Sequence, residues 1–304
     1  MKTEYLKIGA VAIVIALLGA GIYLFVGEET DAEKIEKMGT VLENGALCGL
    51  VVPYYTAEQL EISSISDLNG HASDFDNEII GIDAGAGITE LTNKAITEYD
   101  LSGNFALITS SEAAMLAALD AAYESGSHIV VTLWDPHWAT GVYDLVFLED
   151  PQLVYGEAES IESWARPGLK AEDPVLAKIM EQYSYEMDEF SGLLAYIESN
   201  KESMSAGEAT QNWIEQNPTI KERWLDGVEY QEGRGEITIG LVDWACATGS
   251  SNVLKHLLED VGYSVTLMSL DAGAMYAGLA YGNIDLITTA WVPLTHAQYM
   301  ERYA

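Results

Sequence analysis

The sequence predicts an α/β protein of two lobes that follows one N-terminal transmembrane helix. From Cys48 onward, short apolar runs alternate with amphipathic segments, as strands and helices do in an α/β fold. A Glu-rich, mostly helical segment, residues 143–235, separates two such strand–helix blocks, residues 47–142 and 236–304. An uncharged N-terminal run, long enough to cross a bilayer, precedes both blocks.

The uncharged run covers residues 8–26, which matches the hydrocarbon core of a bilayer at about 1.5 Å per helical residue. Lys2 and Lys7 precede it and acidic residues follow it, so the chain beyond the run is expected outside the cytoplasm. Small residues at 19–21 leave a cleaved signal peptide as the alternative. The apolar residues that continue beyond position 21 favour an uncleaved anchor, which we place at residues 1–26.

The polar, acidic residues 27–45 are predicted to form a short helical stalk. Strands are predicted at residues 49–52, 79–82, 106–109, 129–133, 237–242, 264–268 and 285–289. Helices are predicted at residues 89–99, 112–124, 174–185, 206–216, 251–261 and 272–281. Pro174 and Gly282 stand where a helix start and a helix stop are expected.

The chain is strongly acidic, with 48 Asp and Glu against 14 Lys and Arg and a formal net charge of −34. Nucleic acid is excluded as a partner, because phosphate contacts need clustered basic residues. Basic-patch binding to anionic lipid is disfavoured for the same reason. Because 49% of the residues are hydrophobic, the chain is not a disordered polyanion. The acidity suggests a high-salt, halophilic setting.

The sequence contains no motif that indicates a catalytic site. The five histidines show no metal-ligand spacing, there is no Gly-x-Ser-x-Gly elbow, and neither cysteine is marked as a nucleophile. Cys48 and Cys246 can form one disulfide if the fold brings them together, or they are two unrelated buried residues. We therefore expect neither catalysis, nor a metal, nor a cofactor.

Each of three predicted strands has a tryptophan at or just past its own C-terminal end. These residues are Trp134, Trp244 and Trp291. In open α/β sheets, ligands bind in the crevice beyond this edge. Any one tryptophan is more simply a core residue, but the same placement in both blocks favours a shared aromatic site. Tryptophan faces attract a quaternary ammonium, which cannot donate ordinary hydrogen bonds.

A glycine-rich turn, residues 83–88, joins the predicted strand at 79–82 to the helix that begins near Thr89. Glycines let the backbone approach a ligand, and the helix start adds free N–H groups and a positive dipole end, which suit an anion. The turn lacks the glycine pattern of a dinucleotide site and the lysine of a P-loop, which favours a small carboxylate. Together with the tryptophans it indicates a ligand with a bulky cation at one end and a carboxylate at the other.

From about residue 46 to the C-terminus, the chain resembles the OpuAC-like glycine betaine binding proteins of ABC importers. The segments that carry the resemblance are residues 49–53 (Gly-Leu-Val-Val-Pro), 79–88, 111–115 (Ser-Glu-Ala-Ala-Met), 134–138 (Trp-Asp-Pro-His-Trp), 147–151, 271–275 and 290–296 (Ala-Trp-Val-Pro-Leu-Thr-His). Some members of that family carry the block like 236–304 first, so this chain looks circularly permuted relative to them.

The resemblance implies a two-lobed periplasmic-binding-protein (type II) fold with a hinge. The solute-binding domain would span residues 46–304, with one lobe at 46–60 and 143–304 and the other at 61–142. The resemblance also implies the binding residues. The trimethylammonium group would lie in a box formed by Trp134, Trp244 and Trp291. The carboxylate would be held by the backbone N–H groups of Gly87 and Ile88 and by the side chain of His296.

The implied function is extracytoplasmic binding of glycine betaine and its delivery to an ABC transporter permease for osmoprotective uptake. The alternatives are a binding protein for choline, carnitine or proline betaine, a membrane-anchored betaine sensor, and an enzyme that acts on betaines. The family often has acidic residues after the tryptophan equivalent to Trp244, whereas Ala245 and Cys246 follow here. That departure leaves the choice among betaines open.

Overall fold

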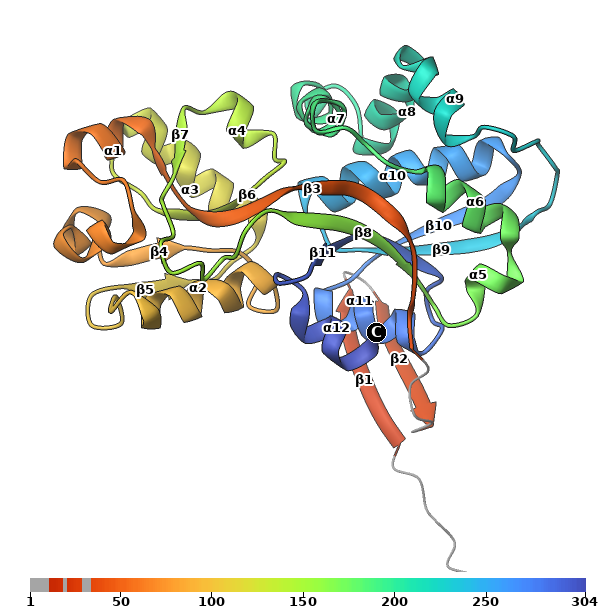
Figure 1. Cartoon of the computed structure of the whole chain (residues 1–304), viewed down its shortest axis with the longest axis horizontal. Coiled ribbons are helices and arrows are strands. Elements are labelled where there is room, and N and C mark those ends of the chain that lie inside the picture. The colour runs from red at the N-terminus through yellow and green to blue at the C-terminus, as the bar shows by residue number, and fades with distance from the viewer. Residues whose placement is uncertain (1–10, 19–20, 29–33) are drawn as a thin grey trace, which may run out of the picture.

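The computed structural model describes residues 11–18, 21–28 and 34–304. Figure 1 shows two α/β lobes side by side, with the long strand β3 (Glu36–Pro53) running from one into the other. One sheet path passes through both lobes in the order β10-β9-β11-β8-β3-β6-β4-β5, and β7 pairs with β3 beside it. The predicted two-lobed α/β architecture is confirmed.

The first lobe is built on the C-terminal half of β3, which pairs antiparallel with β6 and β7. Strand β4 adds parallel pairings to β5 and β6, so that the C-terminal ends of these strands point toward the second lobe (Figure 1). The elements of this lobe are α1 (Tyr54–Leu60), the short 3₁₀ turns Ile65–Gly70 and Ala72–Phe75, β4 (Glu78–Ile80), α2 (Gly87–Glu98), β5 (Ala106–Ile108), α3 (Glu112–Ser125), β6 (Val131–Asp135), α4 (Ala139–Val142) and β7 (Leu145–Phe147).

The second lobe is built on the N-terminal half of β3, which pairs with β8. Helix α10 covers one face of β9, β10 and β11, with α7–α9 beyond it, while α11 and α12 cover the other face (Figure 1). The elements are β8 (Glu159–Ala165), α5 (Leu169–Glu172), α6 (Pro174–Gln182), α7 (Met187–Asn200), α8 (Ala206–Gln216), α9 (Pro218–Trp224), β9 (Gly235–Leu241), α10 (Ala245–Asp260), β10 (Tyr263–Ser269), α11 (Ala272–Ala280), β11 (Leu286–Val292) and α12 (Ala297–Tyr303).

Local sequence signals explain where the helices begin. Ser111 caps α3 by accepting a hydrogen bond from the Ala114 N–H, and Asp173 caps α6, whose first residue is Pro174. Ser205 and Glu208 form a capping box at α8. Each such cap stabilises its helix by about 1 kcal/mol, because it satisfies N–H groups that have no partner within the helix.

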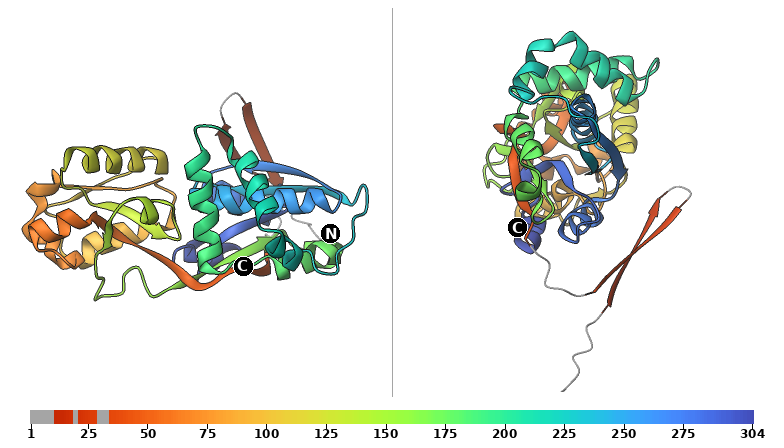
Figure 2. Two further views of the ribbon diagram at one scale, coloured as in Figure 1. Left: turned by 90° about the horizontal axis from the view of Figure 1, so that it is seen from above. Right: turned by 90° about the vertical axis from the view of Figure 1, so that its right-hand side faces the viewer.

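Burial explains why β11 contains no charged residue. Six of its seven residues are buried, because helices cover both faces of the sheet at this strand. The helical segment between the two blocks has its own aromatic packing: Tyr183, Tyr185, Phe190 and Trp224 are fully or almost fully buried and their rings are in contact. This cluster fixes α6, α7 and α9 to the second lobe. Figure 2 shows the strands that cross between the lobes on one side of their boundary, where a hinge would lie.

The N-terminal segment differs from the prediction. We expected one helix over residues 8–26, but Val11–Leu18 and Gly21–Glu28 form two antiparallel strands, β1 and β2; residues 1–10 and 19–20 lie outside the described residues. The run is rich in Val and Ile, whose β-branched side chains favour a strand over a helix, and its glycines lower its helix propensity. No helix in the part of the chain that the structure describes is long and apolar enough to span a membrane.

Two further boundaries differ. The predicted helical stalk at 27–45 is wrong from Glu36 onward, because these residues form the first half of β3 and pair with β8. Helix α1, which we assigned with 46–60 to the lobe of 143–304, packs in the first lobe: the Tyr55 hydroxyl donates to the carbonyls of Ala122 and Ser127, and Thr56 contacts His128. The chain thus leaves the second lobe within β3 itself, at about residue 46.

Candidate functional site

A cavity lies between the lobes, beyond the C-terminal ends of the strands. All six residues that the sequence singled out as binding residues line it. The full lining is Cys48, Ile82, Ala86, Gly87, Ile88 and Trp134 from the first lobe and Trp244, Cys246, Trp291, Thr295 and His296 from the second. Residues from positions 48 to 296 are therefore brought to one space by the pairing of β3 with both sheets.

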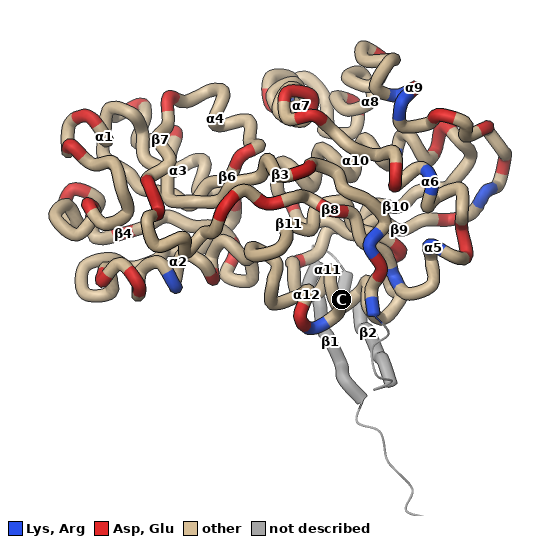
Figure 3. Tube along the Cα trace, in the orientation of Figure 1, with Lys and Arg blue, Asp and Glu red and all other residues tan. Residues whose placement is uncertain are grey.

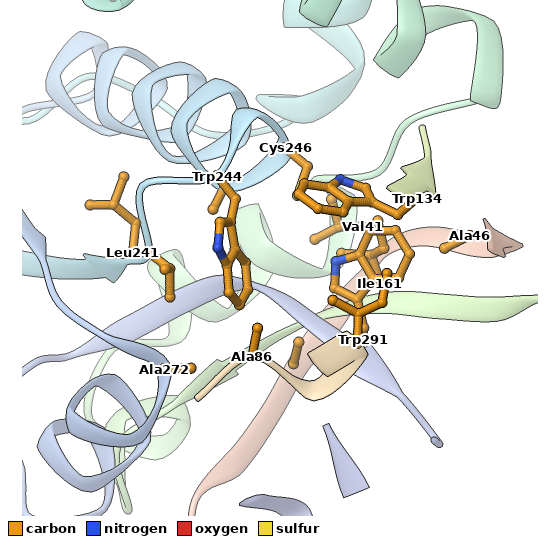
Figure 4. Packing of buried hydrophobic residues seen from close by; sticks show 14 of the residues in the cluster. Val41, Ala46, Ala86, Trp134, Ile161, Leu241, Trp244, Cys246, Ala272 and Trp291 are labelled. Atoms are coloured by element: carbon orange, nitrogen blue, oxygen red, sulfur yellow. The ribbon is translucent and has the colours of Figure 1, made fainter. Parts of the chain in front are cut away.

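Three tryptophans supply the aromatic part of this lining. Trp134 lies in β6 and Trp291 in β11, while Trp244 follows β9 and precedes the first residue of α10. Figure 4 shows the ring of Trp244 facing the rings of Trp134 and Trp291 across a gap. The ring centroids of Trp134 and Trp244 are 6.4 Å apart with planes tilted by 59°, and all three residues are at most 6% exposed. Faces in this arrangement can surround a cation at cation–π distance.

The N-terminus of α2 supplies two backbone donors. Ala86 precedes the helix and provides no side-chain cap, and the N–H groups of Thr89 and Glu90 both reach the Ala86 carbonyl. Among the described residues, no hydrogen bond is formed by the N–H groups of Gly87 and Ile88. They stand at the positive end of a 12-residue helix, an arrangement that binds anions.

Glycine at position 87 also lets the lobes meet. A Cβ atom placed there would lie 1.7 Å from the carbonyl oxygen of Thr295, which belongs to the second lobe. Thr295 is itself held by buried Glu159 of β8, whose carboxylate accepts hydrogen bonds from the N–H groups of Leu294 and Thr295 and from the Thr295 hydroxyl. Glu159 thereby fixes the turn that presents His296 to the cavity; nothing in the sequence had singled it out.

His296 supplies a third donor, and its tautomer follows from its partners. Its Nδ1 accepts a hydrogen bond from the Trp291 N–H at 3.1 Å and lies 2.9 Å from the Tyr276 hydroxyl. A backbone N–H only donates, so Nδ1 carries no proton and the ring proton lies on Nε2. Burial lowers the pKa of His296 to about 3, which keeps the ring neutral at pH 7. The buried Nε2–H has no hydrogen-bond partner among the described residues.

The remaining polar atoms of the lining also matter for what the cavity accepts. The Nε1–H of Trp134 is buried and unpartnered in the described part of the chain, while that of Trp244 donates to Asp83 at 3.2 Å. Cys48 and Cys246 are free thiols rather than a disulfide, and burial raises the pKa of both. No acidic side chain is among the described residues of the lining. The cavity thus offers aromatic faces and hydrogen-bond donors, without a carboxylate to pair with a cation.

Two lobes joined by crossing strands, with a cavity closed between them, define a solute-binding protein of the two-lobed class. The chain belongs to the OpuAC family, described as the substrate-binding domain of the ABC-type glycine betaine transport system, whose model matches residues 7–216 and 235–304. That family consists of transport binding proteins, not enzymes.

Known relatives agree with this assignment. The chain is 37% identical over 226 residues, 74% of either protein, to the glycine betaine/carnitine transport binding protein GbuC of Listeria monocytogenes. Among solved structures it is similar to the glycine betaine, L-proline-binding protein ProX of Borrelia burgdorferi (36% identity, 63% of this chain and 68% of that one, TM-score 0.55). It is also similar to lactococcal OpuAC in its closed form with glycine betaine (31%, 62% and 70%, TM-score 0.55) and to a choline-binding protein with choline (26%, 74% and 73%, TM-score 0.59).

Proposed function

We propose that this protein binds glycine betaine between its lobes and delivers it to the permease of an ABC importer for osmoprotective uptake. The observation that carries the proposal is the composition of the cavity: three tryptophan faces, the free N–H groups of α2 and the unpartnered Nε2–H of His296 in one lining. Membership of the family and similarity to a glycine betaine complex support it.

Each end of glycine betaine has a counterpart in the lining. The trimethylammonium group would lie among Trp134, Trp244 and Trp291, each face contributing roughly 0.5–2 kcal/mol. The carboxylate would accept hydrogen bonds from the N–H groups of Gly87 and Ile88 and from His296. A primary ammonium would lose its water here without finding acceptors, because the described lining contains no carboxylate. The lining therefore selects for a fully methylated nitrogen.

Choline and carnitine are the competing ligands, since relatives with those names are similar to this chain. The unpartnered donors favour a carboxylate over the hydroxyl of choline, because a hydroxyl satisfies fewer of them. Competition followed by tryptophan fluorescence discriminates the ligands. We expect glycine betaine to displace choline with an affinity at least about 100-fold higher. Equal affinity for both would show that the carboxylate donors are not used, and would favour the choline alternative.

The proposed location is the outer face of the cell membrane, with residues 1–26 as the attachment. Only the apolar run supports this attachment, since the described parts of it form strands. Fractionation of cells combined with mass spectrometry of the native N-terminus tests it. Recovery of an intact N-terminus in the membrane fraction is the expected result, whereas a shortened N-terminus in the soluble extracytoplasmic fraction would indicate a cleaved signal.

A further inference from the structure

A buried carboxylate of the first lobe reaches across to the second lobe beside the cavity. Glu112, the first residue of α3, is 6% exposed. Its two carboxylate oxygens lie 3.1 and 3.3 Å from the backbone nitrogen of Ala245, the first residue of α10 in the second lobe, which donates to them. Neither residue is in the cavity lining, so the contact serves something other than holding the ligand directly.

Glu112 is oriented for this contact from within its own lobe. His137 is 2% exposed, and its Nδ1 accepts a hydrogen bond from the Ala139 N–H at 3.0 Å. Its ring proton therefore lies on Nε2, which donates to a Glu112 oxygen at 3.1 Å. Because both residues belong to the first lobe, this hydrogen bond can remain when the lobes separate.

Helix α10, in contrast, depends on the other lobe for its N-terminal partner. It has 16 residues, and Trp244, at the capping position, provides no side-chain acceptor. Glu112 supplies that acceptor and places a negative charge at the positive end of the helix dipole. Trp244 is also held by the first lobe, since its Nε1–H donates to Asp83. Two carboxylates of the first lobe thus hold the ring of Trp244 and the amide that follows it.

We propose that Glu112 is a closure latch: a positioning residue that stabilises the closed form by binding the N-terminus of α10 and thereby holds Trp244 over the ligand. This inference takes the identity of the ligand from the proposed function, whereas the contact between the lobes is observed independently of it. A contact that forms only when the lobes are closed raises the fraction of closed protein. As long as the ligand-free protein is mostly open, the apparent affinity for the ligand rises by the same factor as the closed fraction. Glu112 therefore contributes to betaine affinity without touching betaine.

The test uses the full-length protein with Glu112→Gln. The amide keeps one acceptor oxygen and replaces the other with an NH₂ group. The Ala245 N–H, which lies within reach of both carboxylate oxygens, then loses one of its two acceptors, and the end of α10 loses the negative charge. Glu124→Gln is the matched control: it makes the same change in the same helix, at an exposed position. Ala245→Pro is the second variant; it deletes the donor from the other lobe at a helix position that tolerates proline.

Two measurements distinguish a latch from a general loss of stability. Stopped-flow tryptophan fluorescence gives the glycine betaine dissociation rate, and spin labels on cysteines introduced at exposed Gly103 and Glu232, one in each lobe, give the distance between the lobes. We expect Glu112→Gln and Ala245→Pro to raise Kd about tenfold or more through faster dissociation and to shift the distances toward the open form. Glu124→Gln should match the wild type in both measurements.

Wild-type distances in Glu112→Gln and Ala245→Pro, with or without ligand, would overturn the latch. If Glu112→Gln does not fold, the Ala245→Pro distances decide alone. Failure of the wild type to bind glycine betaine would contradict the proposed function instead, and the ligand-free distance distributions would still decide on the latch.

Discussion

At the scale of single residues, the character of the site lies in buried donors that have no partner. The Nε2–H of His296 and the Nε1–H of Trp134 are both buried and unpaired within the described chain. An unsatisfied buried donor costs about 1–3 kcal/mol, so an arriving acceptor regains that free energy on binding. These atoms make the cavity selective for a ligand that brings a carboxylate.

Replacing Trp291 tests the aromatic part of the site. Trp291→Ala removes one cation–π face and is expected to raise the Kd for glycine betaine at least about tenfold, whereas Trp291→Phe should raise it less. Trp213→Phe is the control, because Trp213 lies outside the described lining and its aromatic contacts are with Tyr185 and Trp224 of its own lobe. Titration by calorimetry measures all three variants; an unchanged Kd in Trp291→Ala would contradict the aromatic box.

The depressed pKa of His296 predicts a pH dependence of stability. The folded-state pKa is about 3 and the unfolded value is near 6.5, so the unfolded chain binds more protons between these pH values. The free energy of unfolding should therefore fall as pH decreases from 6.5 toward 3, by up to about 1.4 kcal/mol per pH unit from this residue. Urea unfolding of the ligand-free wild type and of His296→Gln isolates the effect as their difference. Parallel pH curves would show that His296 is not buried as a neutral ring.

At the scale of elements, strands and helices with a continuous apolar or amphipathic pattern were predictable from sequence. The helix predicted at 206–216 matches α8, since its cap and its periodicity agree. Strand β8 was missed because its buried positions include Glu159 and Ser163, which interrupt the apolar alternation. The first half of β3 was missed because its acidic ends suggested a solvated helix. These errors share a cause: hydrogen bonding to distant strands overrides the local pattern.

Some residues of the candidate site could also be predicted from local sequence, whereas others depend on distant partners. The tryptophans and the glycine turn follow a local rule, since strand ends and helix starts are visible in the sequence. The role of His296 came only from family resemblance, because its tautomer depends on Tyr276 and on the Trp291 backbone. Glu112 and Glu159 could not be singled out, since the backbone amides that donate to them lie more than 130 positions away and acidic residues are abundant. The circularly permuted order of the two blocks stays a prediction.

Gly87, at the start of α2, lies against Thr295 in the turn before α12, so the size of residue 87 should control whether the lobes can close. In Gly87→Ala the new methyl group would meet the Thr295 carbonyl of the other lobe, so the closed form is destabilised while each lobe keeps its own packing. Gly85→Ala is a matched control in the same turn, since its Cβ would only touch the Tyr299 hydroxyl at 3.9 Å. Calorimetry should show betaine affinity reduced about 100-fold or more in Gly87→Ala and little changed in Gly85→Ala. Similar affinities in both would show that the lobes do not close on this residue.

At the scale of the whole molecule, charge and binding are separate properties. Figure 3 shows Asp and Glu spread over both lobes, with the few basic residues concentrated in the second. A net charge of −34 repels itself and destabilises the compact state, and salt screens that repulsion. The ligand proposed here is a zwitterion, and the described cavity lining carries no acidic side chain.

Salt should therefore change stability but not affinity. Raising sodium chloride from about 0.1 M to about 1 M, which shortens the Debye length from about 10 to about 3 Å, should raise the Tm of the ligand-free protein. The Kd for glycine betaine should change by less than about threefold over the same range. Scanning calorimetry and titration calorimetry measure the two quantities, and an affinity that falls steeply with salt would mean that surface charge takes part in recognition.

The most direct test of the central claim is a calorimetric titration of the full-length protein with glycine betaine. The account predicts saturable binding with one ligand per chain, severely weakened in Trp291→Ala and unaffected by an excess of glycine, which lacks the methyl groups. Absence of heat with glycine betaine and with every other quaternary ammonium solute, in a protein that unfolds cooperatively, would contradict it.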